Sequence, residues 1–505
     1  PLPFAGRSDS KSRTNYGRGH FSAVFDPTPK HTAGFDIEYT ERSTHMPTLS
    51  RTTLGQTQSD SRYRQHMDGN TLTATANYIW KIDTLGSQFK LIADYTRYPS
   101  DGDNSYHTTP SAPGTLRDSL YESSTGSVYD ILTADAGLTR KLPHGLTLRA
   151  GLRYTRNGMA DKSHYAAQTQ GTWLALPEYS YDQHYTEQIG AAYASLEYSA
   201  GRWELSAGLR GEYTSVASQT LDRSYFGLFP NVSVSRALNA LRTWLLVAQG
   251  SRNIERPAFP ALNPARIRIS DYSWQSGNPS LRPTYIHRFS LTAVWKYRYT
   301  LTVGGNLHHD LIREIAHRDA TAPDAVYIRP ENHYTENHWF AASVPAKITR
   351  WWNLSVNAVG VMQRIRLNST DSPATHYLMF ADATCSFTLP AGFFAEAAYR
   401  AQSRLYSGNS EVGPRHTLSA TVKKQLFGKR LTLFCTLSNI TGCDWEFASL
   451  TDGMRRTIDA RQAWSGRLWK AGAAWNFRTG KKFRARTVES AAETQRKRLV
   501  KSTEQ

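Results

Sequence analysis

The 505-residue sequence has a formal net charge of +18 and a mean hydropathy of −0.53. It holds no apolar run near the roughly 18 residues that a membrane-spanning helix needs. A membrane protein without such helices crosses as a closed β-barrel, because backbone polar groups in hydrocarbon must pair internally. The positive charges are scattered, without zinc-finger spacing or a basic stripe of interleaved aromatics, which argues against nucleic acid as a partner.

The first 20 residues are polar and predict a lead-in without a strand of its own. The chain begins at Pro1, with no initiator Met and no signal peptide of the usual charged, apolar and small-residue pattern. A membrane protein exported as a β-barrel would need such a signal. We therefore expect the sequence to be a processed or excised portion, or the remnant of a longer gene.

From Phe21 onward, apolar and polar residues alternate with the period of a β-strand. The clearest example is the stretch 146–155, whose two faces separate fully. One face is apolar and holds Leu146, Leu148, Ala150, Leu152 and Tyr154, and the other holds Thr147, Arg149, Gly151, Arg153 and Thr155. The pattern predicts an all-β protein.

The aromatic spacing favours a membrane barrel over a soluble sheet. Trp203 and Tyr213 lie on one face of the same predicted strand. At about 3.3 Å per residue and a tilt of roughly 40°, they are separated by about 25 Å along the barrel axis, which matches an apolar band between two aromatic girdles. The alternative is the ordinary β-propensity of aromatic residues in a soluble sheet.

Short and long connections alternate along the chain, as in barrels with short periplasmic turns and long extracellular loops. Nine short turns and the closing strand near 466–477 predict about 19 antiparallel strands. The short turns lie at 26–31, 82–88, 141–145, 199–202, 237–242, 295–299, 347–351, 389–392 and 426–430. The long outward loops lie at 41–66, 97–125, 155–186, 214–226, 249–285, 308–335, 363–376, 401–415 and 440–461.

The longest irregular stretch, Gln249–Phe289, is rich in proline, asparagine and glycine, and its prolines bar a central strand. It contains three short motifs in order. The residues that carry them are Arg256, Pro257, Leu262, Asn263, Pro264, Gly277, Asn278, Pro279, Leu281 and Pro283. They resemble the "RP … LNP … GNPxLxP" signature of TonB-dependent outer-membrane receptors, in particular the outer membrane β-barrel family. Loop parity places this stretch on the extracellular side, over the barrel mouth.

The resemblance implies a 22-stranded barrel in the bacterial outer membrane, preceded by a plug domain and an energy-coupling segment. About 19 strands are seen, so residues 1–20 are interpreted as a trailing loop of three missing strands and 21–477 as the barrel. We recognise no plug in this chain. The expected partners are outer-membrane lipid and lipopolysaccharide, the barrel-assembly machinery, a surface lipoprotein, and an energy-coupling protein only where an upstream plug exists.

The predicted closing strand carries Trp469, Trp475 and Phe477 on one face and resembles the signal by which barrel proteins are recognised for insertion. The alternative is an ordinary lipid-facing strand. Residues 478–505 follow it with nine Lys and Arg against three Glu. This composition predicts a basic, disordered periplasmic tail.

The sequence contains no motif of a known catalytic site. No nucleophile elbow, zinc-protease helix or phosphate loop appears, so we expect no enzyme and no cofactor. His308, His309, Asp310, His333 and His338 lie in or near one outward loop, yet adjacent histidines on a strand point to opposite faces, and we assign no metal site. The sequence has three cysteines, Cys385, Cys435 and Cys443. It leaves undecided whether Cys435 and Cys443 form a disulfide.

The outward loops are rich in aromatic residues, which offer contact area with a polar handle. The candidate ligand-binding residues are Trp173, Tyr272, Trp274, Tyr334 and Trp339. The alternative is that such rings stack on one another and order the loops. The sequence thus favours a receptor barrel for a large or scarce nutrient, such as a chelate, glycan or peptide. A passive pore, a surface-binding barrel and a non-functional receptor fragment remain alternatives.

Overall fold

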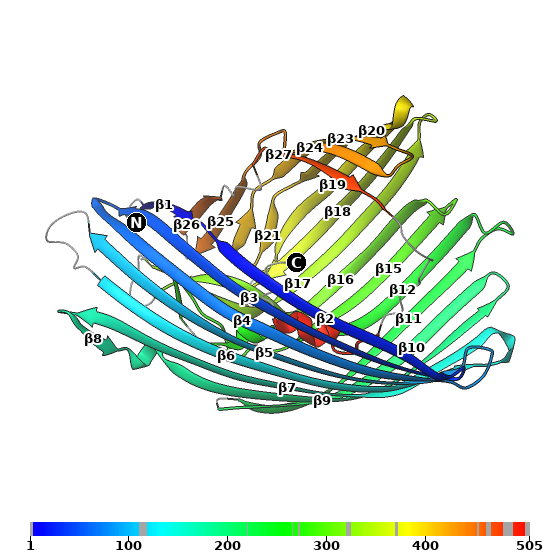
Figure 1. Ribbon diagram of the computed structural model, residues 1–505, viewed down its shortest axis with the longest axis horizontal. Helices are drawn as coiled ribbons and strands as arrows, with labels where there is room; N and C mark the ends of the chain where they lie inside the picture. The colour runs from blue at the N-terminus through cyan, green and yellow to red at the C-terminus, as the bar shows by residue number, and fades with distance from the viewer. Residues whose placement is uncertain are drawn as a thin grey trace.

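The computed structural model describes residues 4–110, 119–219, 221–264, 266–270, 273–319, 325–368, 372–451, 454–460, 466–477 and 488–499. In these ranges the chain forms one sheet of 23 strands and a second sheet of four. The large sheet curves around a lumen (Figure 1). No helix in the described ranges is long and apolar enough to cross a membrane.

Nineteen strands of the described chain form one series in which each strand pairs antiparallel with the next. The predicted fold class and strand number are confirmed. In order these strands are β2 (Arg13–Thr28), β3 (His31–Leu54), β4 (Thr57–Lys81), β5 (Gln88–Pro110), β6 (Ser119–Lys141), β7 (Leu146–Thr169), β9 (Tyr181–Ala200), β10 (Trp203–Ser218), β11 (Asp222–Ala237), β12 (Trp244–Glu255), β15 (Thr284–Trp295), β16 (Tyr299–Arg318), β17 (Val326–Lys347), β18 (Trp352–Arg366), β19 (Ala374–Leu389), β20 (Phe393–Gln402), β23 (Arg415–Leu426), β24 (Leu431–Ser438) and β27 (Leu468–Trp475).

The remaining elements are short. In the large sheet they are β1 (Phe4–Ser10), β8 (Thr172–Ala175), β13 (Ile267–Ser270) and β14 (Ser273–Gln275). The second sheet consists of β21 (Leu405–Ser407), β22 (Ser410–Val412), β25 (Trp445–Thr451) and β26 (Met454–Ala460). The helices are η1 (Pro143–Gly145), η2 (Pro177–Tyr179), α1 (Phe259–Leu262), η3 (Pro390–Gly392), α2 (Glu493–Arg496) and η4 (Lys497–Leu499).

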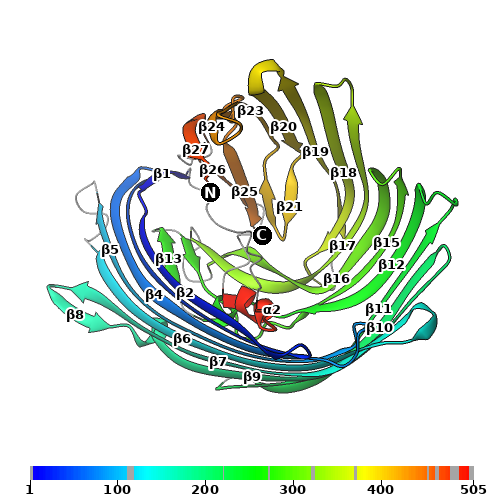
Figure 2. The ribbon, with the colours of Figure 1, turned by 45° about the vertical axis from the view of Figure 1, so that its right-hand side comes forward.

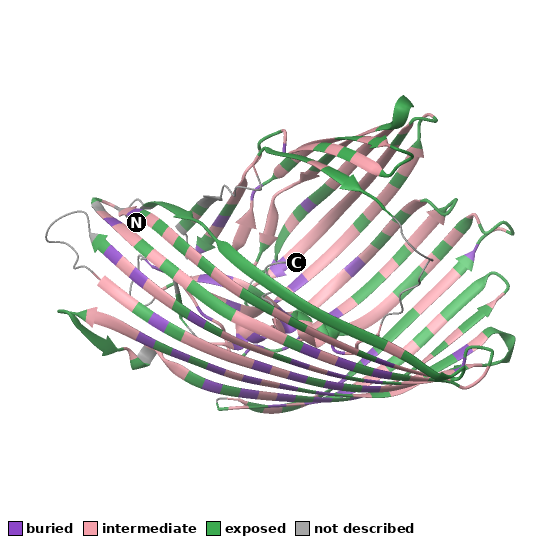
Figure 3. Ribbon diagram, viewed as in Figure 1, coloured by how far each residue is buried: buried purple, intermediate pink, exposed green. Residues whose placement is uncertain are grey.

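The outer face of the sheet carries the predicted apolar band. On β10, Trp203, Leu205, Leu209 and Tyr213 are all exposed on one face. Buried and exposed positions alternate along the strands (Figure 3). The residues that alternate with these outer side chains point into the lumen, and they are mostly polar. We take the aromatic pair Trp203 and Tyr213 as the two borders of the membrane-spanning part of the strands.

Several strands continue far beyond this band on the extracellular side. On β7 the exposed outer positions that follow Tyr154 are Arg156, Lys162 and His164. The predicted loop 41–66 is wrong, because β3 and β4 pair without interruption up to Leu54 and Thr57. Likewise, much of 97–110, 119–125 and 155–169 is strand. Polar residues on both faces conceal the alternation there, since these stretches contact water and not lipid.

The prediction for residues 1–20 is also wrong. Within the described part of the chain, residues 4–10 and 13–20 belong to β1 and β2, and both pair with β3. Polar cross-strand contacts hold them: Arg18 pairs with Glu38 at 2.7 Å, and His20 contacts Asp36 at 2.7 Å. Such pairs stabilise a sheet without any apolar pattern for sequence reading to detect.

The two ends of the strand series are the edges of the sheet. Among the described residues no ladder joins β2 to β27, and Figures 1 and 2 show an opening between them. On the outer face of β27 and just beyond it, Trp469, Trp475 and Phe477 are exposed.

The membrane band yields a direct test. Leu209 lies between Trp203 and Tyr213, so Leu209→Arg places a guanidinium in hydrocarbon and should reduce the free energy of unfolding by about 2–4 kcal/mol. The matched change Leu174→Arg, at an exposed position on β8, should alter it by less than about 0.5 kcal/mol. The measurement is urea unfolding followed by heat-modifiable mobility. Equal effects at the two positions would contradict the assigned band.

Candidate functional site in the barrel lumen

The signature loop, Arg256–Pro283, enters the lumen directly after β12. Arg256 begins it and is almost fully buried. Its Nη2 donates to Glu212 Oε2 at 2.7 Å and to Thr214 Oγ1 at 2.8 Å, and its Nε lies 3.8 Å from Glu187 Oε1. These acceptors belong to β9 and β10. The first residue of the motif therefore fixes the loop to the inner face of this wall through a buried ion pair.

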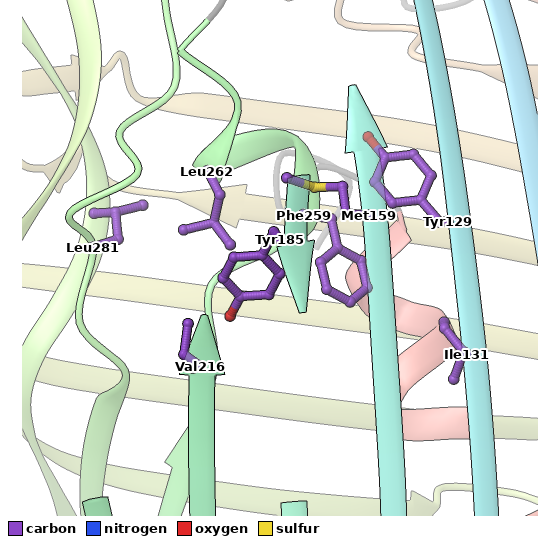
Figure 4. Packing of buried hydrophobic residues seen from close by; sticks show 8 residues of the cluster. All are labelled: Tyr129, Ile131, Met159, Tyr185, Val216, Phe259, Leu262 and Leu281. Atoms are coloured by element: carbon purple, nitrogen blue, oxygen red, sulfur yellow. The ribbon is translucent and has the colours of Figure 1, made fainter. Parts of the chain in front are cut away.

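An apolar cluster continues this attachment. Phe259 and Leu262 of α1, together with Leu281, are buried against lumen-facing side chains of β6, β7, β9 and β10 (Figure 4). The wall side of the cluster consists of Tyr129, Ile131, Met159, Tyr185 and Val216. The Phe259 ring lies 5.6 Å from Tyr129 and 6.5 Å from Tyr185, between ring centroids. Each buried side chain of this size stabilises the packed loop by about 1.5–3 kcal/mol.

The LNP and GNP motifs close the loop on itself. The Gly277 amide donates to Asn263 O at 2.8 Å, and the Asn278 amide donates to Ala261 O at 2.7 Å. A Cβ at Gly277 would lie 2.2 Å from Asn263 O, so only glycine fits at this close approach. These backbone bonds of the motif thus fix the geometry of the loop.

The far half of the loop attaches to β17, which lies beyond β12, β15 and β16 in the same wall. Asn278 Nδ2 donates to Pro330 O of β17 at 3.0 Å, and the Arg282 amide donates to Asn332 Oδ1 at 2.9 Å. β14 pairs parallel with β17 at 326–328. The loop therefore spans part of the lumen, from the inner face of β6–β10 to that of β16 and β17. The prediction placed the loop on the extracellular side, over the barrel mouth. At that end of the barrel the loop folds inward, because its apolar residues pack on wall residues beyond Tyr154 and Tyr213, among them Met159 and Val216.

A cluster of stacked rings and one guanidinium lies where the loop crosses. Trp274 stacks on Tyr179 with centroids 5.9 Å apart and an interplanar angle of 4°. The Arg266 guanidinium lies 5.4 Å from the Tyr179 centroid and 5.5 Å from that of Tyr327. We call these four residues the rim cluster. Sequence reasoning found Trp274 but missed Arg266, whose role depends on contacts between distant segments.

The other candidate ligand-binding residues do not join this cluster. Trp173 is exposed on β8, and Tyr272 lies outside the described residues. Tyr334 shares the outer face of β17 with exposed Phe340 and donates to Glu336 Oε1 at 2.7 Å. Trp339 lies within β17 and not in a loop, on the opposite face from Phe340. The four described candidates, Trp173, Trp274, Tyr334 and Trp339, thus do not form one surface.

Residues 80–469 match the model of the outer membrane protein beta-barrel family. The chain belongs to this family. It is a bacterial outer-membrane protein. Comparison with curated protein sequences returns no match.

Solved structures share the fold of this family member at low sequence identity. The ferric-catecholate import receptor Fiu of E. coli K12 is 10% identical, with a TM-score of 0.57 over 94% of this chain and 82% of the receptor. The ferripyoverdine receptor of the Pseudomonas aeruginosa outer membrane, bound to ferripyoverdine, is 9% identical, with a TM-score of 0.54 over 88% and 69%. FpvA of P. aeruginosa bound to a heterologous pyoverdine is 9% identical, with a TM-score of 0.57 over 94% of this chain and 72% of FpvA.

The histidines of this outer-membrane barrel do not assemble around an ion. His333 is buried in the extracellular part of β17, and burial, with the charge of Arg313 nearby, lowers its pKa to about 4. The His309 ring contacts the rings of His287 and Tyr334. Within the described ranges no three His, Cys, Asp or Glu side chains are grouped closely enough to hold a metal. Cys385, Cys435 and Cys443 are free thiols.

The prediction of a disordered periplasmic tail is wrong for Val488–Leu499. These residues lie in the lumen against the inner face of the wall, with α2 near the signature loop (Figure 2). The Ala491 amide donates to Asp94 Oδ2 of β5 at 2.7 Å, and Arg498 Nε donates to Pro257 O at 3.0 Å. Residues 478–487 and 500–505 of the predicted tail lie outside the described residues.

We expect Arg256→Met to destabilise the barrel by about 3–5 kcal/mol, because the substitution removes one partner of a buried ion pair next to Glu212 and Glu187. The control is Arg282→Met, whose exposed guanidinium pairs with Asp310 and should contribute at most about 1 kcal/mol. Urea unfolding of both variants measures the difference. A loss at Arg256 no larger than that at Arg282 would show that this pair does not anchor the loop.

Asp161 provides a pH test. It is buried on β7, beyond Tyr154 and outside the membrane band, and burial raises its pKa to about 6. Between the unfolded pKa of about 3.9 and this value, the folded state binds more protons, so stability falls as pH rises through this window and stays lower above it. Asp161→Asn should therefore raise thermal stability at pH 8, by up to about 3 kcal/mol. The gain should shrink toward pH 4.

Thermal unfolding at pH 4, 6 and 8 gives the comparison. Asp182→Asn is the matched control, because Asp182 is an exposed carboxyl on β9 whose contact with Lys162 is 3.5 Å long. Its stability difference from the wild type should show no comparable trend with pH. A gain for Asp161→Asn that is equal at all three pH values would refute the assignment.

Proposed function

We propose that this barrel is the ligand-binding part of an outer-membrane receptor that takes up an anionic metal chelate with aromatic groups, in a TonB-dependent manner. The rim cluster carries the proposal. Arg266 is exposed and lies beside the rings of Tyr179 and Tyr327, while Trp274 extends the stack. A planar anionic ligand matches such a set, because guanidinium and aromatic faces favour stacked, negatively charged groups.

Two further observations support this ligand class over a glycan or peptide. The chain has a net charge of +18, which raises the local concentration of anionic ligands at the surface. Receptors of similar fold include one named for ferric-catecholate import and one bound to ferripyoverdine. The energy-coupling protein belongs to the proposal as a partner that acts where the protein includes a plug domain.

The lumen contents favour an energy-coupled receptor over a passive pore. The signature loop spans part of the lumen and is attached to the wall at both ends, and residues 488–499 occupy space along the same wall. In the proposed mechanism, these segments move when a ligand of chelate size passes. Such movement requires work on buried ion pairs and apolar contacts. The proposal assigns a binding role and no catalytic residue.

Binding of ferric catecholates to the purified chain tests the proposal. Arg266→Ala and Trp274→Ala should each weaken binding about tenfold, which corresponds to the loss of roughly 1–2 kcal/mol of stacking and cation–π contact. Trp173→Ala, at the exposed tip of β8, should leave the dissociation constant unchanged. Quenching of tryptophan fluorescence gives the constants, with anionic glycans and peptides as competing ligand classes.

Tighter binding of a glycan or peptide than of any ferric catecholate would overturn the ligand class. A steady open conductance of the wild-type chain in planar bilayers would instead favour the passive pore.

A further inference from the structure

The buried surroundings of Arg498 form a site that the proposed receptor role does not require. We propose that the lumen contains a binding site for a guanidinium group, and that this site holds the chain's own Arg498. The C-terminal segment Val488–Leu499, here the strap, thereby locks the signature loop across the lumen. The occupant is a segment of this chain, and the surface that holds it is shared by the wall and the loop.

The geometry around Arg498 is that of a specific guanidinium site. Its Nη1 donates to the carboxylate of Glu187 and, at 2.9 Å, to Gln495 Oε1. Its Nε donates to Pro257 O at 3.0 Å, and its Cζ lies 4.3 Å from the Phe259 ring centroid. The residue is only 7% exposed. The wall contributes a carboxylate, and the signature loop contributes a carbonyl and an aromatic face. These groups suit the planar, charged guanidinium of arginine, of which Nη2 alone lacks a hydrogen-bond partner in the described structure.

Glu187 connects the strap to the signature loop. This carboxylate is 1% exposed and lies between two guanidiniums, Arg498 of the strap and Arg256 at the start of the loop. Asn157 Nδ2 also donates to it at 2.8 Å. A carboxylate buried this deeply needs compensating charge, and the direct ion pair with Arg498 is closer than the 3.8 Å contact with Arg256. The strap thus completes the charge balance on which the loop anchor depends.

The rest of the strap follows the same wall. Glu489 pairs with Lys90 at 2.5 Å, and the Ala491 amide donates to Asp94. Ala492 is fully buried, and Asn157 Nδ2 lies 3.3 Å from Gln495 Oε1. The strap therefore runs from β5 past β7 to β9 and ends beneath α1, where Leu499 packs against the apolar cluster.

The consequence is a mechanical link. Arg498 contacts the loop at Pro257 and Phe259, the residues that turn the chain into α1. While Arg498 is bound, the near end of the loop is held by the wall and the strap together. Release of the strap removes both the guanidinium and the Leu499 contact, so the loop is then held by fewer buried contacts and the lumen opens more often.

The position of the strap against β5 is tested first, by disulfide formation in the full chain. In a background with Cys385, Cys435 and Cys443 replaced by Ser, the pair Asp94→Cys and Ala491→Cys should oxidise readily in isolated outer membranes. The control pair is Ala491→Cys with Asn357→Cys, because Asn357 lies on β18 and contacts Asp382 there. Only the first pair should form. Equal oxidation of the two pairs, or none in either, overturns the position of the strap.

The guanidinium site is tested by chemical rescue. Arg498→Ala should raise the frequency of open conductance events in planar bilayers at least tenfold, and millimolar methylguanidinium should reverse this, whereas methylammonium should not. Arg498→Lys should give an intermediate frequency, because lysine keeps the charge and loses the fork. Lys497→Ala is the matched control, since Lys497 is exposed and pairs with Glu493.

Heat-modifiable mobility shows that each variant is folded before conductance is recorded. The proposal is overturned if Arg498→Ala shows the same frequency of open conductance events as Lys497→Ala. It is also overturned if methylammonium lowers the frequency in Arg498→Ala as much as methylguanidinium does. Should Arg498→Ala not fold, Arg498→Lys decides: conductance equal to wild type rejects the site, and an increase that methylguanidinium does not alter rejects it as well. These experiments use no chelate, so their outcome is independent of the proposed receptor function.

Discussion

The arrangement of the lumen depends on one buried carboxylate. Glu187 is held in the inner wall by the ladders of β9 with β7 and β10. Its carboxylate pairs with Arg256 of the signature loop and Arg498 of the strap, two segments that lie far apart in the sequence. Removing a carboxylate from water is expensive unless it is paired. Both the signature loop and the strap satisfy that requirement, and both are therefore located by the same residue.

The wall around Glu187 differs from the rest of the lumen. Most lumen-facing positions are polar, for example Asp94, Thr96 and Thr133. The fully buried side chains that pack on Phe259, Leu262 and Leu281 come from β6, β7, β9 and β10, and Tyr98 of β5 and Ile312 of β16 pack against the edge of this cluster. An apolar patch inside a polar lumen requires a cover, and α1 provides it. Burial of these side chains and the ion pairs of Glu187 act together, so the loop has one preferred position.

Sequence reasoning predicted what is repeated and local. The period-two pattern of 146–155, the girdle pair Trp203 and Tyr213 and the nine short turns fix the barrel, because lipid on one side and water on the other impose alternation on each strand separately. Two segments escaped it. β1 and residues 13–20 of β2 are mainly polar on both faces, and the strap belongs to a C-terminal stretch, 478–505, that is basic enough to suggest disorder. Their order arises from Glu38, Asp36 and Glu187, partners that lie far away in sequence.

The residues of the signature motif attach the loop to the wall, and the rim cluster is formed by other residues. Arg256, Gly277 and Asn278 make the loop rigid and attach it at both ends, whereas the rim cluster uses Arg266 and Trp274 from its middle. A ligand that binds at the rim therefore contacts the segment whose anchor lies beside Arg498. Any ligand that prefers a shifted loop also weakens the Pro257 and Phe259 contacts, and by linkage release of the strap favours that ligand equally. The signature loop, which is held at both ends, thus connects the rim cluster to the strap.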